Sequence, residues 1–215
     1  FDGSDVGLGA NNNQDIDAFD LRPDGSILLS IIGDTTLPVI GAVDDSDIVR
    51  FIPTQLGTTT AGTFELYFDG SDVGLTTTAE DVDALNVLND GSIILSTAGN
   101  HSVTGVSGND EDLLRFVPTS TGATTSGTWS IYFDGSDVGL NNTTSEQVNA
   151  VWVHPNGNLY LSSFGTFAVT GTSGDGSDIY ICGLGTLGAN TTCNFRLYFD
   201  GSASGFNKQV TEEKK

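Results

Sequence analysis

The chain has 215 residues, with 28 acidic side chains against 7 basic ones and a formal net charge of −21 at pH 7. This charge excludes a nucleic-acid-binding protein and disfavours anionic membrane surfaces, because like charges repel at long range. No apolar run approaches the roughly 18 residues of a membrane helix, and the chain is long enough to bury a core without a metal or a disulfide.

A repeated octapeptide organises the sequence. The string Phe-Asp-Gly-Ser-Asp-Val-Gly-Leu occurs at 1–8, 68–75 and 133–140, and a decayed copy, Phe-Asp-Gly-Ser-Ala-Ser-Gly-Phe, occupies 199–206. The starting positions 1, 68, 133 and 199 are 67, 65 and 66 residues apart. Self-similarity at a fixed period is typical of repeat architectures, so the sequence predicts three full repeats.

Each repeat is predicted to form four short strands. In the second repeat, apolar residues recur with a period of two in four segments, 82–88, 92–97, 112–118 and 127–134. Asn-Asp-Gly at 89–91 joins the first two, because glycine readily adopts the positive φ that a tight hairpin turn requires. Its counterparts are Pro-Asp-Gly at 23–25 and Pro-Asn-Gly at 155–157. No segment predicts a helix.

A single small sheet of this kind cannot bury both of its faces, which favours stacked β-propeller blades. We therefore predict an all-β fold of propeller-type, four-stranded antiparallel blades, forming one repeat domain over 1–206. The blades are expected at about 9–70, 71–135 and 136–202, and 207–215 are expected to be a flexible tail or linker. The alternative is three small sandwiches, although about 65 residues with four short strands is little for an independent core.

Two segments of the second repeat also resemble a known repeat type. These are Asp-Leu-Leu-Arg-Phe-Val-Pro-Thr at 112–119 and Gly-Thr-Trp-Ser-Ile-Tyr-Phe-Asp-Gly-Ser-Asp-Val-Gly-Leu at 127–140. They resemble a β-propeller-like repeat of the YFDGSDVGL type in large secreted or surface-attached microbial proteins. The resemblance extends to about residue 206. It implies an extracellular setting and a propeller-like fold, and it brings no catalytic residues.

Three blades do not close a ring, since propellers typically have four to eight. The sequence begins without Met, which fits a piece of a longer chain. Two copies forming a six-bladed ring and head-to-tail continuation between molecules are the alternatives. The expected partners are therefore further copies or neighbouring blades of a longer chain. Glycans are a further candidate partner, and no membrane insertion is expected.

Most of the acidic residues fall in two kinds of loop. In an up-down-up-down blade, the loops between the second and third strands share one side with the links between blades. The remaining loops lie on the opposite side and carry few charges. Crowded carboxylates are unfavourable unless cations or solvation offset their repulsion. Calcium is the natural partner, because it takes six to eight oxygen ligands from such loops.

The predicted ligands of a structural Ca²⁺ are Asp69, Ser71, Asp72, Asp134, Ser136 and Asp137, joined by the pairs Asp15/Asp17 and Asp81/Asp83. Residues two apart in a strand point to one face, so each Asp-x-Asp pair is placed to chelate together. The third repeat has Gln147 and Asn149 at these positions, so a site in every blade is not expected. The structural alternative is that Asp and Ser bind backbone amides within tight turns.

Further features point outside the cytosol. Cys182 and Cys193 flank a short stretch rich in Gly and Thr, a spacing that suits a disulfide-closed hairpin, with buried free thiols as the alternative. Glycosylation sequons begin at Asn100, Asn141, Asn142 and Asn190. The expected location is extracellular or at the cell surface.

No catalytic pattern accompanies these features. His101 and His154 are not equivalent by the repeat and lie in no zinc or nucleophile motif. Trp129 and Trp152 are predicted to pack in the core or between blades. The predicted function is a non-enzymatic extracellular module with a structural or adhesive role, as part of a self-associating surface or filamentous assembly. The alternatives are a carbohydrate-binding, lectin-like propeller and, less favoured, a secreted glycan-active enzyme.

Overall fold

The computed structural model describes residues 1–9, 12–141, 143–183 and 185–206. Its fold is all-β, with three four-stranded antiparallel sheets, which confirms the predicted fold class. No helix among the described residues is long and apolar enough to cross a membrane. The predicted tail, 207–215, lies outside the described residues.

Each sheet is one blade, built from one repeat. The first blade contains β1 (Ile16–Leu21), β2 (Ile27–Ile31), β5 (Ile48–Gln55) and β6 (Ala61–Phe68). The second contains β7 (Val82–Val87), β8 (Ile93–Thr97), β11 (Leu113–Ser120) and β12 (Ser126–Phe133). The third contains β13 (Val148–Val153), β14 (Leu159–Ser163), β17 (Ile179–Gly183) and β18 (Asn194–Phe199). The strands of the second blade match the four predicted segments to within two residues.

The turn between the first two strands also forms as predicted. Gly91 has a φ of 84°, and its N–H donates to the carbonyl of Leu88 at 3.0 Å, which closes the turn. Gly25 and Gly157 adopt positive φ at the equivalent positions. The repeated Gly therefore sets the register of the inner hairpin in every blade.

Two kinds of element were not predicted. A hairpin of three-residue strands projects between the second and third strands of each blade. These hairpins are β3 (Thr35–Leu37) with β4 (Gly41–Val43), β9 (His101–Val103) with β10 (Val106–Gly108), and β15 (Phe167–Val169) with β16 (Thr172–Gly174). The second kind is the single 3-10 turn. These turns are η1 (Gly3–Val6), η2 (Asn12–Gln14), η3 (Ser71–Val73), η4 (Thr78–Glu80) and η5 (Ser136–Val138).

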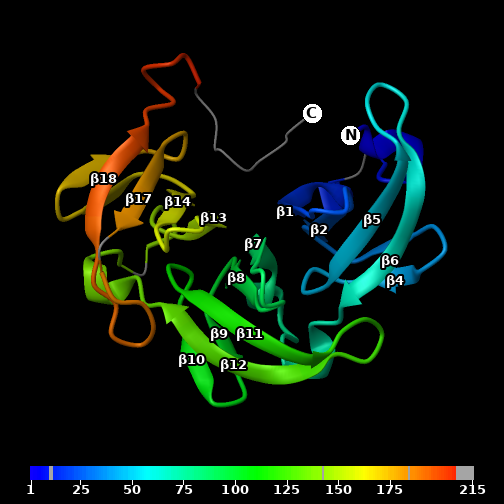
Figure 1. The fold of residues 1–215 in the computed structure, drawn as a ribbon, viewed down its shortest axis with the longest axis horizontal. Helices are drawn as coiled ribbons and strands as arrows, with labels where there is room; N and C mark the ends of the chain where they lie inside the picture. The colour runs from blue at the N-terminus through cyan, green and yellow to red at the C-terminus, as the bar shows by residue number, and fades with distance from the viewer. Residues whose placement is uncertain (10–11, 142, 184, 207–215) are drawn as a thin grey trace.

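The three blades fan around one axis, with β1, β7 and β13 innermost (Figure 1). Apolar side chains from neighbouring blades share two of the three core clusters, and the third cluster belongs to the first repeat alone. Leu28 and Ile48 of the first blade pack in one cluster with Leu95 and Phe116 of the second. A second cluster joins the second and third blades in the same way. The alternative of three separately packed sandwiches does not fit these shared cores.

Candidate functional site

The repeated octapeptide joins each blade to the next. We call residues 1–8, 68–75 and 133–140 the DGSD motifs. Asp69 N–H donates to Thr125 Oγ1 at 2.9 Å, and Thr125 N–H donates to Asp72 Oδ2 at 2.8 Å. The same pair of bonds links Asp134 and Asp137 to Thr191, and Asp2 and Asp5 to Thr60. All three threonines are buried. The motifs at 68–75 and 133–140 therefore each close a water-poor joint between the end of one blade and the next, and the motif at 1–8 makes the same bonds to the first blade.

Further hydrogen bonds of the motif lie within the same turn. Asp69 Oδ1 accepts from Ser71 Oγ at 2.7 Å and from Asp72 N–H at 3.3 Å. Asp134 Oδ1 accepts from Ser136 Oγ at 2.7 Å. The predicted calcium ligands of the two loops therefore have partners in the protein, which supports the structural alternative for this motif.

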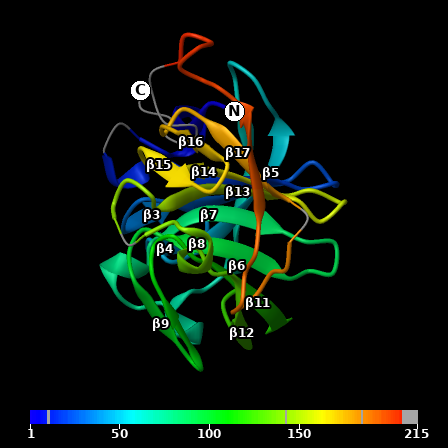
Figure 2. The ribbon, with the colours of Figure 1, turned by 90° about the vertical axis from the view of Figure 1, so that its left-hand side faces the viewer.

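The same contacts correct one prediction. The loop between the third and fourth strands was expected on the opposite side from the links between blades, yet Thr125 of that loop lies against the link that leaves the first blade. The cause is sheet twist, since each strand turns by roughly 20–25° relative to its neighbour and three steps accumulate to roughly 60–75°. In Figure 2, β7 and β13 run across the view, whereas β18, coloured orange, runs at a steep angle to both. The outer loops consequently reach the rim between blades.

An acidic groove follows the first of these joints. It has a volume of about 760 Å³ and lies between the β3–β4 hairpin and the link into the second blade. Its acidic lining consists of Asp34, Asp44, Asp45, Asp47 and Asp69. Burial raises the pKa of Asp47 to about 6, although its carboxylate accepts from Asp44 N–H and Gly70 N–H. The carboxylates of this groove thus serve partly as acceptors for backbone amides.

The predicted Asp-x-Asp pairs are arranged across blades. Asp81 is only 8% exposed and hydrogen-bonds Asp17 of the preceding blade. Burial, with the nearby carboxylates of Asp17, Asp45 and Asp83, raises the pKa of Asp81 to about 9. At the next joint, Gln147 takes the place of Asp81 and donates from Nε2 to Asp83 Oδ2 at 2.7 Å. One joint thus pairs two carboxyl groups where the other pairs an amide with a carboxylate.

No group of three or more His, Cys, Asp or Glu side chains is arranged to hold a metal ion within the described residues. Calcium therefore stays a prediction for these loops.

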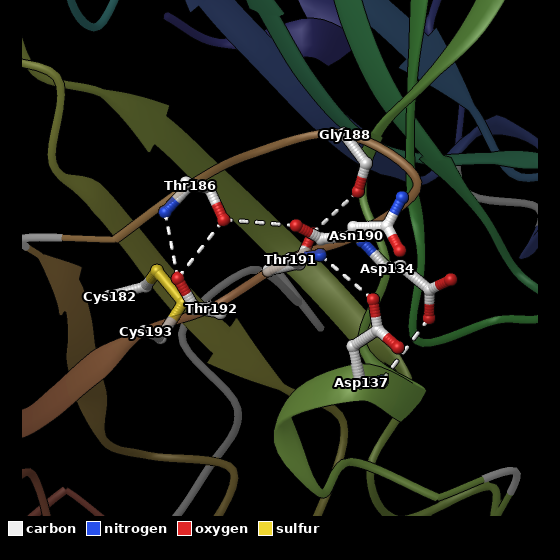
Figure 3. Close-up of a disulfide and its surroundings, with 9 residues drawn as sticks. All are labelled: Asp134, Asp137, Cys182, Thr186, Gly188, Asn190, Thr191, Thr192 and Cys193. Atoms are coloured by element: carbon white, nitrogen blue, oxygen red, sulfur yellow. Dashed lines mark hydrogen bonds between the residues drawn. A yellow bond between two sulfur atoms is a disulfide. The ribbon is translucent and has the colours of Figure 1, made fainter.

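The predicted disulfide is present. Cys182 and Cys193 are bonded, with their Cα atoms 5.0 Å apart. The bond closes the loop that carries Thr191, so it sits beside the joint formed with Asp137 (Figure 3). It therefore restrains the loop of the third blade that receives the preceding DGSD motif.

Three of the four predicted sequon asparagines are placed. Asn100, Asn141 and Asn190 are exposed, as an acceptor for glycosylation must be. Asn142 lies outside the described residues. Glycosylation of these side chains stays a prediction.

A cluster of aromatic side chains lies on the third blade. We call Trp152, His154, Tyr160 and Tyr198 the aromatic cluster. The ring centroids of Trp152 and Tyr160 are 5.0 Å apart, and those of Tyr160 and Tyr198 are 4.9 Å apart. Trp152 is 49% exposed and Tyr198 is 62% exposed. The prediction of a packed Trp side chain is correct for Trp129, whose ring centroid lies 4.7 Å from that of Phe116. It is wrong for Trp152.

Trp152 also borders a hollow at the axis of the fan. This axial hollow has a volume of about 370 Å³ and is lined by the three innermost strands. Its lining residues are Ala18, Phe19, Asp20, Leu21, Ala84, Leu85, Asn86, Asn149, Ala150, Val151 and Trp152. Asn149 is 2% exposed, and its Oδ1 has no hydrogen-bond partner in the described part of the chain. A hollow that combines aromatic, aliphatic and amide groups has the composition of a small-ligand site.

No protein-family model matches the chain, and no curated protein matches it. The extracellular domain of the putative one-component system BT4673 from B. thetaiotaomicron is similar over 94% of this chain and 31% of that chain, with 13% identity and a TM-score of 0.29. The chain thus spans about a third of that structure's length.

Proposed function

We propose that this protein is a non-enzymatic extracellular blade module with a structural or adhesive role. The observation that carries this proposal is the use of the repeated acids. In each DGSD motif the aspartates bind the threonine of an adjoining blade, so the most regular feature of the sequence supplies joints. A catalytic pair normally occurs once in a chain, whereas these acids recur with the scaffold.

An extracellular location is supported by the disulfide. Cys182 and Cys193 are bonded, and disulfides persist mainly in oxidising compartments. The exposed sequon asparagines are compatible with secretion. The charge of −21 favours solubility of a protein that works outside the cell.

The structural role includes contact with a further blade, from another copy or from a longer chain. Leu21 is 66% exposed on the first blade, whereas its equivalent in the second blade, Val87, is 7% exposed against the first. Phe19 and Phe1 are exposed in the same way, and their equivalents Leu85 and Phe68 are buried. The outer face of the first blade therefore displays the side chains that an internal joint covers.

Sedimentation velocity over a range of concentrations tests this role. We expect concentration-dependent association that Leu21→Asp abolishes, because the substitution places a charge on the exposed face. Val39→Asp is the matched control, since Val39 is 86% exposed outside that face. A monomer that neither associates at any concentration nor adheres to polysaccharide-coated or protein-coated surfaces would contradict the proposal. Release of reducing sugar from any glycan would contradict its non-enzymatic part.

Carbohydrate binding is the second candidate function. The specific observation that favours it is the exposed aromatic cluster, which occurs only on the third of the three described blades.

A further inference from the structure

We infer that the axial hollow and the adjoining aromatic cluster bind a neutral carbohydrate. This inference rests on the adhesive role proposed above and assigns to it a ligand class and a site. The site would take one or two pyranose rings, because a hollow of about 370 Å³ falls at the small end of ligand pockets.

The aromatic cluster supplies the apolar part of such a site. The C–H faces of a pyranose ring are apolar, and they pack on the faces of Trp and Tyr side chains while the hydroxyl groups stay solvated. Trp152 is 49% exposed and Tyr198 is 62% exposed, so both side chains are accessible without rearrangement of the blade. Tyr160 lies between them. Its ring centroid is 5.0 Å from that of Trp152 and 4.9 Å from that of Tyr198, so it holds the cluster together.

The axial hollow supplies a polar group that lacks a partner. A buried amide oxygen without a hydrogen bond is unfavourable, and Asn149 Oδ1 is such an atom within the described residues. Because this oxygen is itself buried, a sugar hydroxyl donates to it only after the Asn149 side chain turns toward the hollow. Asn86, on the same hollow, already donates to Asp20 and accepts from Val153 N–H. Asn149 is therefore the lining amide with an acceptor to offer.

The charge of the protein selects the class of carbohydrate. With a net charge of −21, the chain repels sulfated and uronic-acid glycans at long range. The axial hollow itself contains no basic side chain among its lining residues. Neutral glycans carry no such penalty.

The substitutions on the third blade argue against a further blade as the occupant. In the first two blades the residues equivalent to Trp152 are Asp20 and Asn86, which accept from Val87 N–H and Val153 N–H of the next blade. Trp152 cannot accept these bonds. The decayed octapeptide has Ala203 where the DGSD motifs have the aspartate that holds the next threonine. The third blade thus lacks two groups that hold neighbours at the internal joints.

Affinity electrophoresis and calorimetry with neutral polysaccharides test the inference. The probes are soluble β-glucan, xylan, galactomannan and dextran, with alginate and heparin as acidic arms. We expect retardation by at least one neutral polysaccharide and by neither acidic one. Trp152→Asn, which restores the residue type of the second blade, should weaken binding at least tenfold, and Asn149→Ala should weaken it severalfold. Leu56→Asn, an exposed apolar residue elsewhere, is the matched control and should bind as wild type.

Thermal unfolding keeps the result interpretable. Trp152→Asn should leave the melting temperature within a few degrees of wild type, because the side chain is half exposed. Absence of binding to every neutral polysaccharide, or equal binding by Trp152→Asn, overturns the inference. Binding of equal strength to acidic polysaccharides overturns the ligand class.

Sedimentation separates this inference from the wider proposal. Loss of self-association in Trp152→Asn would identify the aromatic cluster as a contact between copies and overturn the inference. Association that depends on Leu21, without any glycan binding, would overturn the carbohydrate site and leave the structural role standing. Neither binding nor association would overturn both.

Discussion

The carboxyl pair at the first joint should make the protein less stable as the pH rises. Asp81 has its pKa raised by burial and by neighbouring carboxylates from an ordinary value of 3.8 to about 9. Between these values the folded state holds a proton that the unfolded chain releases. The stabilisation is therefore present at low pH and is lost as the pH rises through this window.

Asp81→Gln removes this dependence. The second joint already contains the substitution, because Gln147 donates to Asp83 where Asp81 meets Asp17. A group that keeps one extra proton on folding changes the free energy of unfolding by up to about 1.4 kcal/mol per pH unit. From pH 6 to pH 8, the wild type should therefore lose up to about 2.7 kcal/mol through Asp81 that the variant retains.

Urea unfolding at pH 6, 7 and 8 measures the difference. The stability of Asp81→Gln relative to wild type should increase with each step, while shared contributions such as that of Asp47 cancel in the comparison. Glu65→Gln removes the same formal charge from an exposed side chain and should follow the wild-type slope. Equal slopes for Asp81→Gln and wild type would refute the assignment of a shared proton to this pair.

Three further predictions concern the joints and the predicted cation. Asp72→Ala removes the acceptor of the N–H of the buried Thr125. It should lower the free energy of unfolding by about 1–3 kcal/mol in urea titration. A change below about 0.5 kcal/mol would contradict the importance of the joint. The double substitution of Cys182 and Cys193 by Ser should lower stability by about 2–4 kcal/mol, and equal urea midpoints under reducing and oxidising conditions would contradict it. Chelation with EDTA should lower the melting temperature if Ca²⁺ occupies the acidic loops. An unchanged melting curve would contradict the prediction of a structural Ca²⁺.

The blade architecture could be predicted because its signals are local and repeated. Period-two apolar segments and a Gly at each inner turn specify the strands, and the DGSD string fixes the period. The three-residue hairpins, such as β9 with β10, were missed because so short a strand shows too few alternations to define a period. The loop positions were wrong because a linear strand order contains no information on accumulated twist.

The aromatic cluster was missed for a different reason. The residue type alone predicts a packed side chain at Trp152, because Trp is large, apolar and largely buried on average. In an alignment of the three repeats, the residues equivalent to Trp152 are Asp20 and Asn86, and both are polar. An aromatic residue at a position that is otherwise polar marks a departure from the scaffold, and this comparison was available in the sequence. The unpaired Oδ1 of Asn149 could not be predicted from the sequence, because it depends on how three strands pack together.

The DGSD joint makes the repeat a self-contained building unit. The segment from Phe68 to Tyr132 carries both the aspartates of one DGSD motif and Thr125, which binds them. A tandem duplication of its coding sequence therefore adds, with each copy, a motif that follows the last strand of the preceding blade and the threonine that holds it. Designers of longer arrays can insert additional cassettes without inventing an interface for each one.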